Sequence, residues 1–143
     1  MQYQKIDNQT FVVRIERGEE IIASLQKFCQ KESIVGGFFY GIGAVDKVEL
    51  AHYDVATKKY SSKKFTQALE LTNLTGNVGQ FENNLIIHAH ASLADKKMTC
   101  LGGHLVKATV SGTAEIYFIQ APSLKKNLDE ETGLKLFCLE KNL

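Results

Sequence analysis

Residues that signal a specialised class of protein are scarce in this sequence. Tryptophan is absent, proline occurs once, and the three cysteines (Cys29, Cys100 and Cys138) show no CxxC spacing. An odd number of cysteines without such spacing indicates neither a disulfide framework nor a cysteine zinc site, so we expect reduced, mostly buried thiols. No internal repeat, low-complexity tract or linker interrupts the chain. Residues 1–143 are therefore expected to form a single domain.

The sequence also lacks an excess of charge of one sign. Seventeen Lys and Arg residues face 16 Asp and Glu residues, and the formal net charge is +1. Proteins that neutralise many phosphates usually carry a basic excess, so charge alone indicates no nucleic-acid partner. No apolar run reaches the about 18 residues typical of a membrane span, and the first residues lack an apolar core after a basic start. We therefore expect a cytoplasmic protein without membrane association.

Hydrophobic periodicity predicts one helix and many strands. Apolar residues such as Ile21, Leu25 and Phe28 recur at helical spacing within residues 18–32, with acidic residues at the start and lysines near the end. Residues 11–16 alternate like a strand with one buried face. Further strand-like segments cover residues 34–45, 48–55, 62–76, 83–94, 98–110 and 113–121, and the tail 133–143 favours a short terminal strand. The pattern indicates an α+β fold with a mainly antiparallel sheet of about seven strands and one prominent helix.

Four glycines within residues 36–43 resemble a nucleotide-binding loop only superficially. A dinucleotide fingerprint needs Gly-x-Gly-x-x-Gly spacing in a turn that opens a helix, whereas these residues lead into another strand-like segment. We interpret the glycines as allowing bulges or close backbone packing in a bent strand.

Three of the four histidines lie between His88 and His104. Strand alternation places His88 and His90 on one face of their strand. If residues 95–97 form a hairpin loop, His88 lies opposite His104, and three imidazoles come within reach of one ion. A register shift of one residue would turn His104 to the other face. The histidines are thus either separate strand residues or the ligands of one metal.

Three imidazole nitrogens with an open fourth position are typical of catalytic zinc, although iron, nickel, copper and cobalt accept similar ligands. Cys100 is a candidate fourth ligand, diagonal to His90. His52 lies in another predicted strand and is interpreted as solvent-facing. Glu70 and Glu115 are candidate carboxylates for supporting a ligand or moving a proton if their strands flank the hairpin, and exposed strand charges otherwise.

Several short motifs, in this order, resemble the plants and prokaryotes conserved (PPC) domain. They are RGEE (17–20), GIGAV (41–45), LTGNV (74–78), HAHASLAD (88–95) and GGHL (102–105). The resemblance implies an α+β domain assembled as a homotrimer. In bacterial and archaeal members the histidine cluster can hold a metal, commonly zinc, in a pocket near a subunit boundary. The matching positions here are His88, His90 and His104.

The resemblance also separates the functional alternatives. In land plants this domain is joined to AT-hooks with an Arg-Gly-Arg-Pro element, which is absent here, so direct DNA binding is not expected. We predict a metal-binding, trimeric protein that binds a small ligand or partner at its three-histidine site. The alternatives are a DNA-associated or regulatory interaction protein, and a metal-dependent hydrolase or lyase. A cupin is disfavoured, because Ala94 and Asp95 stand where a glutamate would follow its HxH motif.

Overall fold

Two long strands form the centre of the sheet. The computed structural model describes residues 1–140, and in it β3 (Gly37–Asp54) and β7 (Cys100–Gln120) pair antiparallel over most of their length. The other strands of this sheet are β1 (Gln2–Lys5), β2 (Thr10–Glu16), β4 (Lys59–Phe65), β5 (Leu69–Phe81) and β6 (Asn84–Ala94). The predicted α+β class, with a main antiparallel sheet of seven strands and one helix within residues 1–140, is confirmed.

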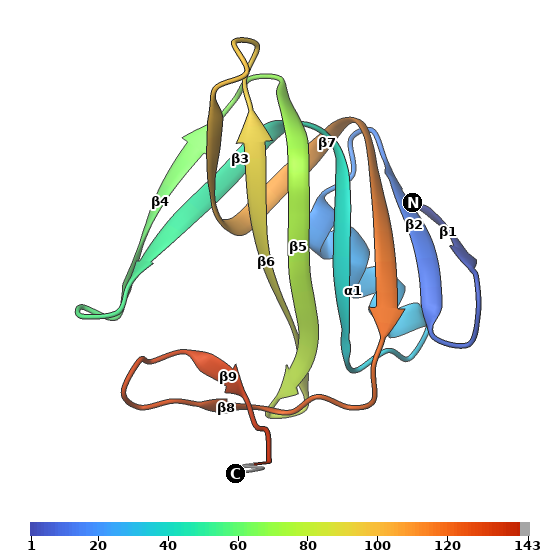
Figure 1. Cartoon of the computed structure of the whole chain (residues 1–143), viewed down its shortest axis with the longest axis vertical. Coiled ribbons are helices and arrows are strands. Elements are labelled where there is room, and N and C mark those ends of the chain that lie inside the picture. The colour runs from blue at the N-terminus through green and yellow to red at the C-terminus, as the bar shows by residue number, and fades with distance from the viewer. Residues whose placement is uncertain (141–143) are drawn as a thin grey trace.

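The strand pairings form a closed circuit. The order is β1-β2-β7-β6-β5-β3-β4, and the additional β7–β3 pairing joins the two sides, so β7, β6, β5 and β3 each have a partner on both sides over part of their length. Figure 1 shows β3 and β7 crossing the molecule beside α1, with β1 and β4 at opposite sides. Because the pairings close on themselves, the sheet curves. Its inner face forms the core, and its outer face is the opposite surface.

The helix α1 (Ile21–Lys31) packs against the inner face of the sheet. Its N-cap residue, Glu20, accepts hydrogen bonds from the backbone N–H groups of Ile22 and Ala23 at 3.1 and 2.7 Å. The same carboxylate accepts one from the N–H of Ala108 in β7 at 3.0 Å, which ties the start of the helix to the sheet. Phe28 is fully buried and packs edge-to-face against aromatic rings of the sheet, 5.2 Å from Phe118 between ring centroids.

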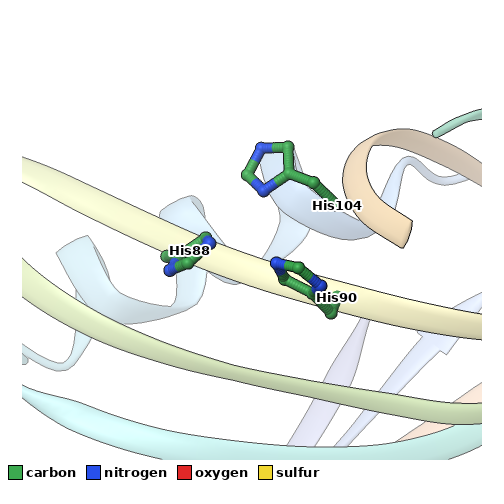
Figure 2. A group of neighbouring side chains, drawn as sticks. All are labelled: His88, His90 and His104. Carbon is green, nitrogen blue, oxygen red and sulfur yellow. The ribbon is translucent and has the colours of Figure 1, made fainter. Parts of the chain in front are cut away.

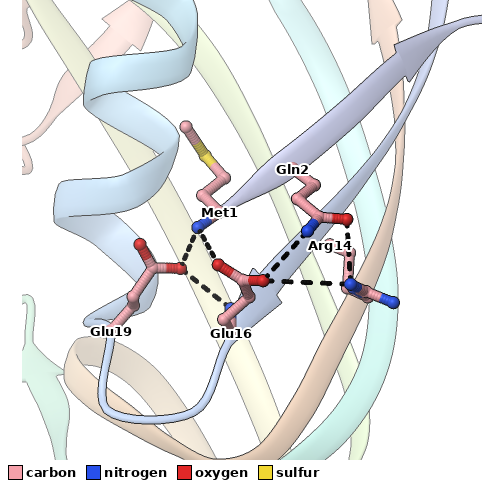
Figure 3. A network of polar contacts seen from close by, with 5 residues as sticks. All are labelled: Met1, Gln2, Arg14, Glu16 and Glu19. Atoms are coloured by element: carbon pink, nitrogen blue, oxygen red, sulfur yellow. Dashed lines mark hydrogen bonds and ion pairs between the residues drawn. The ribbon is translucent and has the colours of Figure 1, made fainter.

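The short strand β1 was not predicted, because its four residues are mostly polar and show no alternation. A polar network holds it in place, as Figure 3 shows. The amino group of Met1 contacts the carboxylates of Glu16 and Glu19 at 2.9 and 2.6 Å, and Gln2 contacts Glu16 and Arg14. The two carboxylates raise the pKa of the amino group above its usual value. The network joins β1 to the end of β2 and the turn before α1.

Strand boundaries differ from the prediction at three places. Segments 34–45 and 48–55 form one continuous strand, β3, and segments 98–110 and 113–121 form one strand, β7. Segment 62–76 instead divides into β4 and β5. Shifts of register within the β3–β7 pairing let one continuous strand change direction, so these two strands read as four in the sequence.

The glycines of β3 allow close approach to β7. A Cβ atom on Gly41 would lie 2.5 Å from the carbonyl oxygen of Glu115, and one on Gly43 would overlap the carbonyl oxygen of Thr113. The pairing of β3 with β5 also changes register between these two glycines. The interpretation of this segment as a bent strand with close backbone packing is confirmed.

The described chain ends in a second, two-stranded sheet of β8 (Lys126–Leu128) and β9 (Lys135–Phe137). The predicted terminal strand is confirmed as β9, and residues 141–143 of that prediction lie outside the described residues. In the part of the chain that the structure describes, no helix has the length and apolar character needed to cross a membrane.

The cysteines are only partly as predicted. Cys29 lies in the core, and burial raises the pKa of its thiol to about 12. Cys100 and Cys138 are exposed, so the prediction of mostly buried thiols is wrong for two of the three. Cys100 is the first residue of β7 and Cys138 follows β9, so both lie at strand ends.

Candidate metal centre

Strand β6 presents its histidines on the outer face of the sheet. Ala89, Ala91 and Leu93 point into the core and are at most 3% exposed, whereas His88 and His90 alternate with them and are exposed. The core therefore determines which way the imidazoles point, because turning the strand over would bury two histidines and expose its apolar residues. The predicted facing of this strand is confirmed.

The reversal between β6 and β7 is longer than predicted. The loop covers residues 95–99, not 95–97, and Ala94 pairs with Cys100. The Asp95 carboxylate holds the turn by accepting hydrogen bonds from the backbone N–H groups of Lys97 and Thr99, at 2.8 and 3.0 Å. Met98 adopts a positive φ of 62°, which completes the reversal. Side-chain to backbone bonds of this kind are typical of Asp in turns.

The longer loop changes which histidines lie opposite each other. His104 pairs with His90, so the prediction that it lies opposite His88 is wrong. The register differs from the predicted one by two residues, and a shift of two keeps every side chain on its face. The convergence of the three rings therefore survives the error in loop length.

The three imidazoles lie around a common centre. Ring centroids are 5.2 Å apart for His88 and His90, 5.1 Å for His88 and His104, and 5.5 Å for His90 and His104. Figure 2 shows His88 and His90 on one strand, with His104 reaching toward them from the neighbouring β7. One ring nitrogen from each residue lies within 4.8 Å of the others.

This geometry fits a metal ion. Nitrogen–metal distances of about 2.0–2.1 Å place the ligand nitrogens of a tetrahedral site about 3.3 Å apart, which small rotations of the rings would achieve. The Nδ1 atom of His104 is buried and has no hydrogen-bond partner within residues 1–140. A buried imidazole nitrogen without a partner is costly unless a ligand satisfies it.

The local environment lowers the pKa of two of these rings, those of His88 and His104, and so favours the neutral form that binds metal. Removal of water from around the His88 ring lowers its pKa to about 4, and the neighbouring His104, His90 and Lys126 lower it further in the same direction. Burial, followed by the nearby His90, also lowers the pKa of His104. Near pH 7 both rings therefore have a free nitrogen lone pair without first losing a proton.

Two of the histidines, His88 and His104, line a cavity of about 330 Å³. Tyr60 of β4 packs against the ring of His104, with ring centroids 5.2 Å apart. The opposite side comes from the β8–β9 region, including Lys126 and Leu136. The hydroxyl of Tyr53 donates to the carbonyl oxygen of Thr132 at 2.7 Å, which joins the β3–β4 hairpin to this C-terminal segment.

The other candidate residues lie apart from the three histidines. Cys100 is exposed opposite Ala94, four pairs closer to the turn than the level of His90 and His104, and does not belong to the cluster. His52 is exposed on β3, as predicted. Glu70 and Glu115 are exposed and line a different depression beside Gly43 and Thr113, so they do not support the histidines.

Three residues of the site were not identified in the sequence: Tyr60, Asn77 and Lys126. Asn77 lies opposite His88 on β5, and its side chain accepts a hydrogen bond from Lys126. Asn77 falls within the LTGNV motif, which was a usable signal. Lys126 and Tyr60 lie in lysine-rich segments without a distinctive pattern, and only the folded chain brings them to the histidines.

A comparison with protein families assigns this architecture. The family model described as the Plants and Prokaryotes Conserved (PCC) domain, the PPC domain of the sequence analysis, matches residues 3–122. The chain belongs to this family. The matched residues include all three histidines of the PPC domain cluster, whereas β8 and β9 follow the matched segment.

Solved structures share the PPC fold over almost the whole chain. A protein of Bacteroides thetaiotaomicron, provisionally described as DNA-binding, has a TM-score of 0.91 and 28% identity, with 96% of each chain covered. A PPC protein of Pyrococcus horikoshii has a TM-score of 0.85 and 29% identity over 94% of each chain. A protein of Archaeoglobus fulgidus, described as metal-containing, has a TM-score of 0.85 and 26% identity over 97% of this chain and 99% of that one. No curated protein matches.

The lowered pKa of His88 predicts a pH dependence of stability for metal-free protein. The unfolded chain binds a proton at His88 near its ordinary value of 6.5, whereas the folded chain binds it only near 4. Between these two values the unfolded chain binds more protons than the folded chain, so the free energy of unfolding falls as the pH drops from 6.5 toward 4. Above pH 6.5 His88 makes no pH-dependent difference. Thermal unfolding in a chelator should show Tm falling between pH 7 and pH 5.

His88→Asn should reduce this fall, and His52→Asn should not. An equal fall in all three proteins would contradict the shift.

Proposed function

We propose that this protein binds one divalent metal ion per chain through His88, His90 and His104, and that a small ligand occupies the open side of the ion. The convergence of three imidazoles from two paired strands supports the proposal. The metal-containing description of the Archaeoglobus fulgidus protein supports it as well. A cytoplasmic location is part of the proposal and agrees with three free thiols, because reducing compartments preserve them.

Zinc is the metal that we propose. Three neutral nitrogen ligands with one open position are typical of zinc sites that bind an exchangeable group. When bound, such an ion supplies Lewis acidity to an oxygen of the ligand. The chain's part is to hold three rings at fixed positions, to favour the unprotonated form of His88 and His104, and to shape the cavity beside them. Binding is therefore the proposed function, and a hydrolase or lyase activity would be an addition to it.

The metal site is tested by removing one ligand and, separately, the histidine outside the cluster. Protein purified without an affinity tag should contain about one zinc ion per chain by elemental analysis. His104→Ala should lose it, with affinity lower by more than about 100-fold, since even the loss of an outer supporting group commonly costs 10- to 100-fold. His52→Ala, on the exposed surface of β3, should retain the wild-type content. Retention of metal by His104→Ala would refute the three-histidine site, and another metal at full occupancy would refute only the choice of zinc.

We also propose that the protein assembles as a homotrimer through the outer face of β2, β3 and β7. Apolar side chains there are unusually exposed, with Tyr40 at 54% and Ile42 at 62%. Phe38 lies opposite Ile119, and Tyr40 lies opposite Tyr117, so the exposed groups form one continuous patch across paired strands. Large exposed apolar patches commonly mark subunit interfaces.

A charge placed in this patch should disrupt assembly. Light scattering coupled to size exclusion should give the mass of three chains for the wild type. Ile42→Glu should shift the mass toward one chain, because burying an unpaired carboxylate in an interface is costly. Val55→Glu, at an exposed apolar residue in the turn after β3, is the matched control and should remain trimeric. A monomeric wild type, or a trimeric Ile42→Glu, would contradict the proposal.

A DNA-associated role is the second candidate, because the Bacteroides thetaiotaomicron neighbour carries that provisional description. A net charge of +1 gives it little electrostatic support. Fluorescence anisotropy with a DNA duplex, repeated at several salt concentrations, should show weak binding with a shallow salt dependence. Tight binding with a steep negative slope would favour the DNA-associated role over the small-ligand role.

A further inference from the structure

Lys126 is a buried ammonium group in the wall of the histidine cavity. The residue is 5% exposed, and it shares the cavity lining with His88 and His104. Its Nζ atom donates a hydrogen bond to the side-chain oxygen of Asn77 at 2.8 Å and lies 4.5 Å from the centre of the Phe137 ring. Asn77 in turn lies opposite His88 in the β5–β6 pairing. The amine is therefore held at the level of the metal ligands.

The bonding capacity of this amine is only partly used. An ammonium group has three N–H donors, and within residues 1–140 Lys126 makes one hydrogen bond and no ion pair. Burial lowers the pKa of Lys126 from its usual value, which records the cost of charge at this position. Buried lysines are ordinarily paired with an acidic group. The structure provides an amide oxygen and a ring face, which stabilise the charge without neutralising it.

The charges around the cavity have one sign. Lys126 and Lys135 are the lysines among its lining residues, and no Asp or Glu is among them. Imidazole ligands supply no negative charge, so a divalent ion held by the three histidines would keep its double charge. The loaded cavity therefore has a strong positive potential in a partly enclosed space, where electrostatic attraction is stronger than in water.

We propose that Lys126 and the open side of the metal together bind an oxyanion, the carboxylate or phosphate group of a small ligand. This inference rests on the proposed metal site and adds the chemical class of what binds there. One oxygen of the anion would meet the ion, and a second would accept the remaining N–H groups of Lys126. A volume of about 330 Å³ limits the ligand to a small molecule. The apolar side chains of Ile86, Leu134 and Leu136 would contact its uncharged part.

The test uses the intact chain loaded with cobalt(II), whose visible absorption reports changes at the metal. Inorganic phosphate and acetate are titrated separately, and the tighter of the two identifies the type of oxyanion. Lys126→Met removes the charge and keeps the length of the side chain. It should retain about one metal per chain and bind the preferred anion at least about 10-fold more weakly, a loss of about 1.4 kcal/mol. Lys125→Met, at the adjacent exposed position, is the matched control and should bind like the wild type.

Lys126→Arg provides a second measurement if the methionine variant is unstable. It keeps the positive charge and should bind the anion within a few-fold of the wild type. Equal anion affinity in the wild type and Lys126→Met, with metal content unchanged, would overturn the role of Lys126 and leave the metal site intact. Failure of the wild type to change its spectrum with either anion would overturn the oxyanion site. Loss of metal from the wild type itself would instead refute the function on which this inference rests.

Discussion

The site depends on one constraint, which is the face of the sheet to which each residue of the paired strands β6 and β7 points. Ala89, Ala91 and Leu93 of β6 and Leu105 of β7 are buried in the core, so the residues that alternate with them must point outward. Any register that preserves this burial places His90 and His104 on the same face. The hydrophobic core thus determines the direction of the imidazoles, and the Asp95 turn determines only which of them lie opposite each other.

This constraint explains which predictions succeeded. Alternation in β6 was readable, because one set of residues is apolar and the other polar. The length of the β6–β7 loop could not be predicted, because an Asp carboxylate can hold turns of different lengths and the sequence does not show which one forms. Strand ends within β3 and β7 were also missed, since a bulge in a continuous strand resembles a turn. The charged cavity wall was missed for another reason: Lys126 and His88 are distant in sequence and meet only through β5.

The cavity combines two kinds of chemistry from separate parts of the chain. The histidines come from the central sheet, where both neighbouring strands restrict their movement. Lys126 comes from the small β8–β9 sheet. Contacts of this region with the main sheet include the bond from Lys126 to Asn77, the bond from Tyr53 to Thr132, and the packing of Phe137 against Phe38. The three histidines of the central sheet thereby share a cavity with a side chain from a separate C-terminal segment. Substitutions in that segment would change the cavity wall without changing the three histidines.

Closure of the strand circuit leaves β1 and β4 as the free edges of the main sheet within residues 1–140. Unpaired edges are templates on which other chains can add strands and aggregate. Here β1 is only four residues long and ends in Lys5, whereas β4 carries Lys59, Lys63 and Lys64. Short length at one edge and repeated positive charge at the other disfavour the addition of further strands at either edge.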